Sequence, residues 1–339
     1  MSNTEMRPRE LHSDRHDCAD AIEVLTARDV PLGGPRAMTV RRTLPQRSRS
    51  LIGPWCFVDH FGPDDVSATG GMSVPRHPHT GLATVTLLFS GAIDHRDSTG
   101  FANTVRPGEV NLMIAGHGVS HSEFSTERTE VLHGVQLWYA LPDSLRDGPP
   151  GSQHHVAEVV DVPGGSLVVY LGSVAGTGSL IETRTPALAA EVLVPASAHL
   201  ELELDPEHEH GLLVDTGDVT VTGTGPAGAG RDLVLAAEDL LYLPPGARRL
   251  AVSASGDSDA RLILIGGPPF PEDIVMWWNF VARSHEEILA SREQWQREIG
   301  PTPSGAERFG PFPADTPAAL PAPELPNARI RPRSRGTRP

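Results

Sequence analysis

The chain has 339 residues, a formal net charge of -15 at pH 7 and a pI near 5.4. This acidic balance argues against direct binding of nucleic acids, which would need a basic face. There is no apolar run long enough to span a bilayer, and Cys18 and Cys56 are the only cysteines. We therefore expect no membrane association, no disulfide framework and a reducing, cytoplasmic location.

The two ends of the chain have compositions that do not favour folding. Residues 1–21 are rich in charged side chains without an apolar core, so we predict disorder there and no secretion signal. Residues 300–339 are rich in Pro, Ala and Arg, and we predict a disordered tail that contacts at most an acidic partner.

Residues 22–145 show the pattern of a small all-β domain. Short apolar and β-branched runs, such as 83–89 and 110–114, are separated by Gly and Pro turn signals at Ser90-Gly91 and Pro107-Gly108. Short strands at this spacing are typical of a small antiparallel barrel or a double-sheet jelly roll.

Two short motifs in this domain carry metal-ligand residue types. They are His77-Pro78-His79 and His121-Ser122-Glu123. Residues two apart in a strand share a face, so two such strands would present three imidazoles and one carboxylate to a common point. This donor set suits a divalent first-row transition metal and leaves one or two coordination positions open. An isolated His-x-His motif is usually a surface or core feature, but the flanking strands favour a metal site here.

The second half of the chain echoes the first. His208-Glu209-His210-Gly211 is followed by strand-like runs and turns at the spacing seen after His77-Pro78-His79. The positions corresponding to His121 and Glu123 fall near Ala251 and Ser253, which cannot bind a metal. We therefore predict a second barrel over residues 146–299 without a metal, place His208 and His210 in a loop or on the surface, and expect one metal per chain.

A helix is predicted over residues 284–298. Ser284 and Glu287 have the spacing of a capping box, in which Ser284 is the N-cap and Glu287 reaches back. Gly300 and Pro301 end the helix, and its apolar residues should pack on the outside of a sheet.

Over residues 22 to 298 the sequence resembles the pirin family of bicupins. The resemblance rests on the two ligand motifs and on several further motifs: Gly53-Pro54 to Phe61-Gly62-Pro63, His95-Arg96-Asp97-Ser98, Arg106-Pro107-Gly108, Ala115-Gly116-His117-Gly118, His133 to Trp138, Ile265 to Pro269, and Glu286-Glu287-Ile288. It implies two antiparallel cupin barrels face to face, with one mononuclear metal in the N-terminal barrel. The family's four ligands correspond to His77, His79, His121 and Glu123.

The sequence departs from the family pattern beside the ligands. Thr80 and Ala83 stand where the family usually has Arg and Glu, and His117 stands where it usually has Arg between two glycines. None of these is a ligand, so metal binding is not threatened. They alter the charge expected near the cavity mouth, so a substrate or partner cannot be copied from other members.

The resemblance implies two functions of different classes. One is a dioxygenase of the quercetin 2,3-dioxygenase type, a monomer that acts on a flavonol or similar enolisable aromatic with O₂. In it Fe(II) is the expected metal, with Mn, Ni, Cu or Zn as alternatives, and Glu123 is both ligand and catalytic base. The other is a non-enzymatic regulator, similar to a transcription cofactor, that binds a protein partner according to the oxidation state of its iron.

Other residues leave two interpretations open. His117 either lies at the cavity rim as a hydrogen-bond donor or belongs to a surface turn. Trp55, Phe57 and Trp138 either line the cavity or are ordinary core residues. For His95 and His133 we expect packing or hydrogen bonding, and for Asp59-His60 a structural role.

Overall fold

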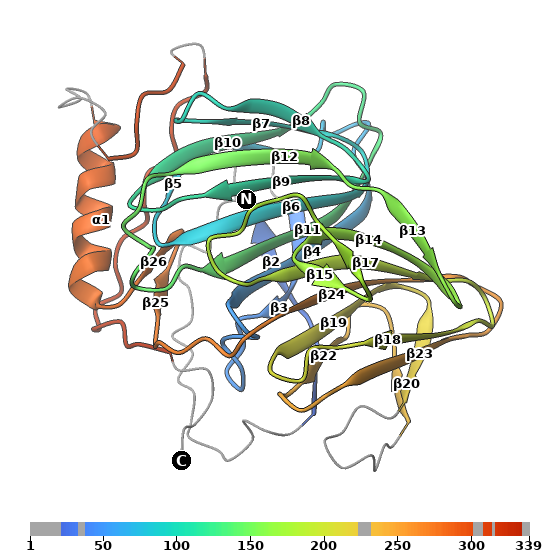
Figure 1. The fold of residues 1–339 in the computed structure, drawn as a ribbon. Coiled ribbons are helices and arrows are strands. Elements are labelled where there is room, and N and C mark those ends of the chain that lie inside the picture. The colour runs from blue at the N-terminus through green and yellow to red at the C-terminus, as the bar shows by residue number, and fades with distance from the viewer. Residues whose placement is uncertain (1–21, 33–37, 223–231, 301–307, 314–315, 334–339) are drawn as a thin grey trace.

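A computed structural model describes residues 22–32, 38–222, 232–300, 308–313 and 316–333. Two β-barrels lie side by side, and one helix covers a flank of the first (Figure 1). The predicted all-β, two-barrel architecture is confirmed. The predicted disorder of residues 1–21 lies outside the described residues. Within the described ranges, no helix is long and apolar enough to cross a membrane.

The first barrel is a sandwich of a seven-stranded and a four-stranded antiparallel sheet. The larger sheet runs, in spatial order, β12 (Gly151–Val156), β9 (Glu109–Ile114), β6 (Leu82–Ser90), β11 (Val131–Ala140), β4 (Trp55–Asp65), β3 (Met38–Leu44) and β2 (Arg28–Leu32). The smaller sheet runs β5 (Ser73–His79), β10 (Val119–Ser125), β7 (Ile93–Asp97) and β8 (Ala102–Val105).

The second barrel repeats this plan. Its larger sheet runs β1 (Glu23–Leu25), β22 (Leu240–Leu243), β19 (Glu209–Thr216), β24 (Ala260–Gly267), β17 (Leu188–Val194), β14 (Gly165–Leu171) and β13 (Val159–Val162). Its smaller sheet runs β18 (His199–Glu203), β23 (Arg249–Ser255), β20 (Asp218–Thr222) and β21 (Leu233–Leu235). Two hairpins, β15 (Ser173–Val174) with β16 (Thr177–Gly178) and β25 (Val275–Trp277) with β26 (Phe280–Ala282), and the helix α1 (His285–Glu298) complete the fold.

The two larger sheets pack against each other and form the interface between the barrels. One continuous cluster of buried apolar side chains includes Val135 and Leu137 of β11 and Leu213 and Ile263 of the second barrel. Because side chains alternate along a strand, Gln136 points from β11 to the opposite side, into the first barrel. This alternation divides each large sheet into a face for the partner barrel and a face for its own interior.

Strand pairing crosses the domain boundaries predicted from the sequence. Glu23 of β1 pairs with Tyr242, so the first described strand belongs to the second barrel. Conversely, β12 lies beyond residue 145 but pairs with β9 of the first barrel. The predicted boundaries at residue 22 and at residues 145–146 therefore need correction. Turn signals locate the end of a strand, but they do not determine which sheet edge the strand joins.

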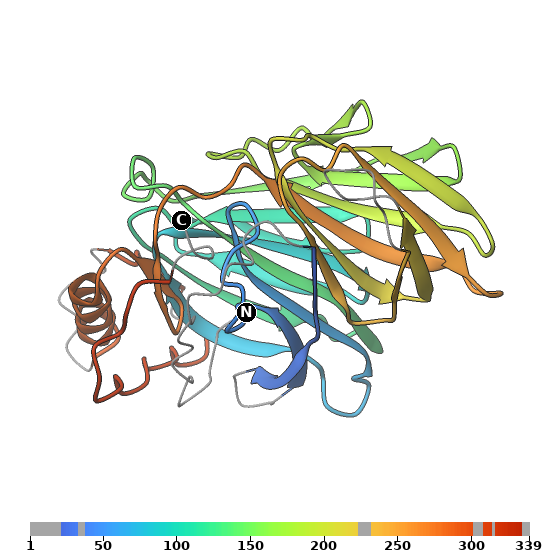
Figure 2. The same cartoon turned by 90° about the horizontal axis from the view of Figure 1, so that it is seen from below.

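The helix α1 begins as predicted at the N-cap Ser284, whose hydroxyl accepts a hydrogen bond of 3.2 Å from the N–H of Glu287. The Glu287 carboxylate reaches one residue further back than a capping box requires and accepts from the N–H of Arg283 at 3.0 Å. It also pairs with Arg146 at 2.8 Å. The helix packs on the β25–β26 hairpin, on the side of the first barrel away from the second barrel (Figure 2).

The described part of the C-terminal tail is packed, which corrects the prediction that residues 300–339 are disordered. Phe309 is fully buried and its carbonyl accepts from the Ser120 hydroxyl at 2.8 Å. The Arg76 guanidinium donates to the Gly310 carbonyl, and the Trp295 indole donates to the Leu320 carbonyl. The apolar content of the tail is low, but its few apolar side chains reach a surface that the helix leaves incomplete.

Removing the Phe309 ring should destabilise this region. The ring lies 5.4 Å from Trp295 and 6.1 Å from Phe280, centroid to centroid. Truncation of a buried aromatic side chain leaves a cavity, so Phe309→Ala should lower the free energy of unfolding by about 3 kcal/mol in chemical denaturation. Arg329→Ala breaks only an exposed ion pair and should cost less than about 1 kcal/mol. Equal effects of the two substitutions would contradict a packed tail.

Candidate metal centre

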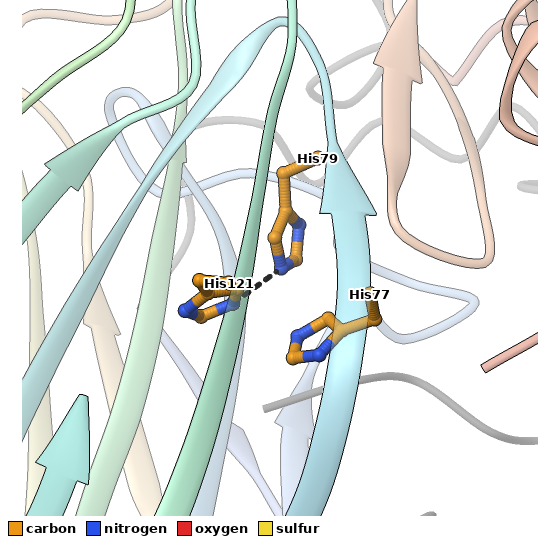
Figure 3. A group of neighbouring side chains, drawn as sticks. All are labelled: His77, His79 and His121. Carbon is orange, nitrogen blue, oxygen red and sulfur yellow. Dashed lines mark hydrogen bonds between the residues drawn. The ribbon is translucent and has the colours of Figure 1, made fainter. Parts of the chain in front are cut away.

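Strands β5 and β10 carry the two predicted ligand motifs and pair directly. His121 lies opposite His77, and Val119 lies opposite His79. The register shifts between His121 and Glu123, where β10 bulges. The alternation of side chains then turns all three imidazoles into the first barrel (Figure 3).

The three imidazoles form a compact group. His79 Nε2 lies 3.0 Å from His121 Nε2, and the ring centroids of His77 and His121 are 4.2 Å apart. One ring nitrogen from each of the three residues lies within 4.8 Å of the others. All three side chains have no exposed surface. Three convergent buried imidazoles are a donor set for a transition metal.

Backbone carbonyls orient two of the rings. His77 Nδ1 donates to the Pro75 carbonyl at 2.9 Å, and His79 Nδ1 donates to the Asn279 carbonyl at 3.2 Å. A proton on Nδ1 leaves the lone pair on Nε2, which is the tautomer a metal ligand needs. His77 Nε2 has no hydrogen-bond partner among the described residues. The site therefore fits a metal ion by the orientation of its donors.

The carboxylate of Glu123 stands beside this group. It clusters with His121 and His95, so the four predicted ligands fall into two overlapping groups that share His121. The Thr86 hydroxyl lies 3.3 Å from Glu123 Oε1 and 2.9 Å from the side-chain oxygen of Gln136. Glu123 is also fully buried.

Burial makes these imidazoles good ligands at neutral pH. It disfavours the protonated form and lowers the pKa of His77 to about 3. The same cause, with the neighbouring His77, holds the pKa of His79 and His121 well below the usual value. Metal ions bind only the neutral ring, so protons do not compete with a metal near pH 7.

Of the aromatic residues Trp55, Phe57 and Trp138, the last two lie inside the first barrel, near the three imidazoles. The Trp138 indole meets the His79 ring edge-on at 5.0 Å, and Phe57 stacks on Trp138 at 4.0 Å. Trp138 Nε1 and Gln136 Nε2 are buried donors without a hydrogen-bond partner among the described residues. Trp55 faces the other barrel and donates to the Gly266 carbonyl.

Sequence reasoning missed His95 as a site residue. Its strand β7 pairs with β10 so that His95 lies opposite Glu123. His95 Nδ1 is 3.4 Å from His121 Nδ1, and its Nε2 is 3.4 Å from Asp97. The spacing His95-x-Asp97 repeats the pattern of the ligand motifs and could have indicated this position.

The structure decides between the two interpretations of His117 and tests the predicted positions of His208 and His210. His117 is exposed and its Nδ1 contacts the Gly148 carbonyl at 3.1 Å, as expected for a surface turn. His210 contradicts the prediction of a loop or surface position because it is the second residue of the central strand β19 and is only 1% exposed. His208 is half-buried in the preceding turn, 3.6 Å from Asp205. Neither belongs to a cluster of three metal-ligand groups within the described residues.

Burial lowers the pKa of His210 to about 4, which makes stability depend on pH. The unfolded chain takes up a proton near pH 6.5, whereas the folded chain does so only near pH 4, so acidification across this window favours unfolding. Acidification should lower the free energy of unfolding less in His210→Gln than in the wild type, by up to about 3 kcal/mol. Denaturation at several pH values measures this difference. An unchanged slope for His210→Gln would show that the fold does not lower the pKa of this imidazole.

The fold and the site define a class of protein: a bicupin with a cluster of metal-ligand side chains inside one of its barrels. Comparison with known sequences gives the family. The pirin profile matches residues 37–139, and that of the pirin C-terminal cupin domain matches residues 189–299. The chain belongs to the pirin family.

The relatives match most of the chain. A Pseudomonas aeruginosa protein named "Putative quercetin 2,3-dioxygenase PA1205" is 39% identical over 96% of this chain and 98% of its own length. A pirin-like protein of Caulobacter vibrioides is 32% identical over 80% of this chain and 92% of its own. A crystal structure of quercetin 2,3-dioxygenase from Acinetobacter baumannii superposes with a TM-score of 0.81 at 34% identity, covering 92% of this chain and 97% of that one.

Proposed function

We propose that the protein is a metal-dependent dioxygenase of the quercetin 2,3-dioxygenase type, a cytoplasmic monomer that acts on a flavonol or a similar enolisable aromatic. One observation carries the proposal. Three buried imidazoles converge in the first barrel, and buried hydrogen-bond donors without partners lie on the wall beside them. The names of the Pseudomonas and Acinetobacter relatives support the same chemistry.

In this proposal His77, His79, His121 and Glu123 hold one divalent metal, Fe(II) in the first instance. The metal would supply a Lewis acid that acidifies a substrate hydroxyl and a place where substrate and O₂ meet. The backbone carbonyls behind His77 and His79 keep both rings in the ligating tautomer.

The barrel wall would hold the substrate. The Gln136 amide and the Trp138 indole can donate to substrate oxygens, which would satisfy two buried donors that have no partner among the described residues. The Phe57–Trp138 pair offers an aromatic surface close to His79. These groups recognise a planar, oxygen-bearing aromatic ligand.

Glu123 would act as the catalytic base. Its carboxylate takes the proton from the substrate hydroxyl, which leaves an enolate oxygen on the substrate and a carboxylic acid on Glu123. The Thr86 hydroxyl, 3.3 Å away, holds the carboxylate in position. The buried environment excludes bulk water, which strengthens these electrostatic contacts.

Oxygen uptake tests this function. Protein loaded separately with Fe, Mn, Ni or Cu, with occupancy confirmed by elemental analysis, is mixed with a panel of flavonols and other enolisable aromatics in an oxygen electrode. We expect metal-dependent O₂ consumption with at least one substrate. A negative result across the whole panel would overturn the proposal that the protein is an enzyme. An affinity for a protein partner that differs between Fe(II) and Fe(III) would then indicate the regulator.

A further inference from the structure

A second group of metal-ligand side chains lies between the two barrels. His60 of β4 and His133 of β11 come from the first barrel, and Asp215 of β19 comes from the second. All three are buried, with exposed fractions of 2%, 6% and 4%. They lie outside the barrel interior that holds His77, His79 and His121.

Strand register places these residues at one edge of the interface. His60 lies opposite Val135, whose side chain packs against the second barrel. His133 is two residues before Val135, at a register shift of β11 that turns its ring toward His60. Asp215 likewise follows the interface residue Leu213 by two positions, at a bulge of β19. Two irregular strands thus bring ligand groups of both barrels together.

The ligand atoms converge closely. The Nε2 atoms of His60 and His133 are 3.2 Å apart, and they lie 2.7 and 2.6 Å from Asp215 Oδ1. Ligand atoms on a tetrahedral zinc ion with bonds of about 2.0–2.1 Å are about 3.3–3.4 Å apart. The two nitrogens already have this spacing, and Asp215 Oδ1 would need to move outward by less than about 1 Å.

Neighbouring groups hold the carboxylate in a ligating form. Arg261 Nη1 donates to Asp215 Oδ2 at 3.2 Å, which leaves Oδ1 directed at the imidazoles. Glu191 pairs with the other side of Arg261 at 3.0 Å. Among these three side chains, the carboxylates of Asp215 and Glu191 outnumber the single guanidinium of Arg261, a balance that favours a cation beside them.

We propose that His60, His133 and Asp215 form a second divalent metal site, suited to Zn(II) or Co(II), that joins the two cupin barrels. Three protein ligands with two nitrogens and one oxygen leave the fourth position to water. The expectation of one metal per chain considered only ligand pairs inside the duplicated barrels. This site lies between the barrels, and it is independent of the proposed dioxygenase.

The site would couple metal binding to docking of the barrels. Because the ligands come from both barrels, an ion held by all three binds only the docked arrangement. Such binding stabilises the docked fold by mass action, in proportion to the ion concentration relative to its dissociation constant. Zinc should therefore raise the melting temperature even when the site inside the first barrel is disabled.

The test uses the full-length protein with His121→Ala, which disables the site inside the first barrel. After removal of metals with a chelator, Zn(II) is titrated by calorimetry and Co(II) by its visible absorption. We expect about one equivalent of tightly bound Zn(II) in this variant. Adding His133→Gln removes a ligand and should therefore weaken zinc binding strongly. The loss should exceed the roughly 10–100-fold that follows when a residue hydrogen-bonded to a ligand is removed. Glutamine can still donate to Asp215, so the hydrogen-bonded interface is retained.

His199→Gln in the His121→Ala background is the matched control. It removes an exposed imidazole of the second barrel that lies outside the cluster, so it should retain the equivalent of zinc. Anomalous diffraction from a zinc-soaked crystal gives a readout that does not depend on any variant, and we expect a peak between His60, His133 and Asp215. Absence of that peak, or equal zinc binding with and without His133→Gln, would overturn the proposal and leave a hydrogen-bonded contact without an ion.

Discussion

Replacing His121 with alanine is expected to remove most of the iron from the first barrel while the protein stays folded. His121 belongs to both overlapping ligand groups, so its loss breaks the contact of the site with Glu123 as well as with His79. The barrel core consists of apolar strand residues, and a metal should add stability by mass action without being required for folding. Iron content after loading and dialysis, with circular dichroism for the fold, measures both effects.

His117→Ala is the control for this experiment. His117 is an exposed imidazole four residues away, so its removal should change neither iron content nor fold. If His121→Ala unfolded the protein, the site would be structural and closed, not open to a substrate. If it kept its iron, His121 would not be a ligand.

Replacing Glu123 with glutamine is expected to lower flavonol turnover per bound metal by roughly 10²–10⁴-fold. Glutamine has nearly the same shape and can still accept from Thr86, but it cannot take a proton at neutral pH. Rates are therefore divided by the metal content of each sample. This separates the loss of proton transfer by Glu123 from any loss of metal binding.

The exposed Glu127→Gln, just beyond β10, should retain the wild-type rate per metal. A Glu123→Gln variant whose rate falls only in proportion to its metal content would show that Glu123 is a ligand and not a base. In that case Glu123 would remain a proposed metal ligand, and its proposed role as proton acceptor would be rejected.

Local sequence pattern predicted the fold, and the structure brings three of the four predicted ligand side chains together. The period-two alternation and the Gly and Pro turns indicated two antiparallel barrels, and the family resemblance indicated how they face each other. The spacing of His77-x-His79 placed both rings on one face of β5, and the structure brings His121 to the same point. Spacing within a strand is sufficient here because it determines which side chains share a face.

Features that depend on pairing between distant strands were not predictable in the same way. His95 enters the site because β7 pairs with β10, and β1 crosses to the second barrel because it pairs with β22. His60, His133 and Asp215 meet only because two bulged strands face each other across the interface. The tail packs because Phe309 fits between Trp295 and Phe280, which composition alone does not show.

An anomalous difference map of crystals of the Fe(II)-loaded protein shows directly whether His77, His79, His121 and Glu123 bind the metal. The proposed ligand set predicts a peak inside the first barrel, within about 2.0–2.2 Å of the Nε2 atoms of His77, His79 and His121 and of a Glu123 carboxylate oxygen. These distances are usual for nitrogen and oxygen ligands of first-row ions. A crystal with confirmed iron content and no peak at these residues would contradict this ligand set.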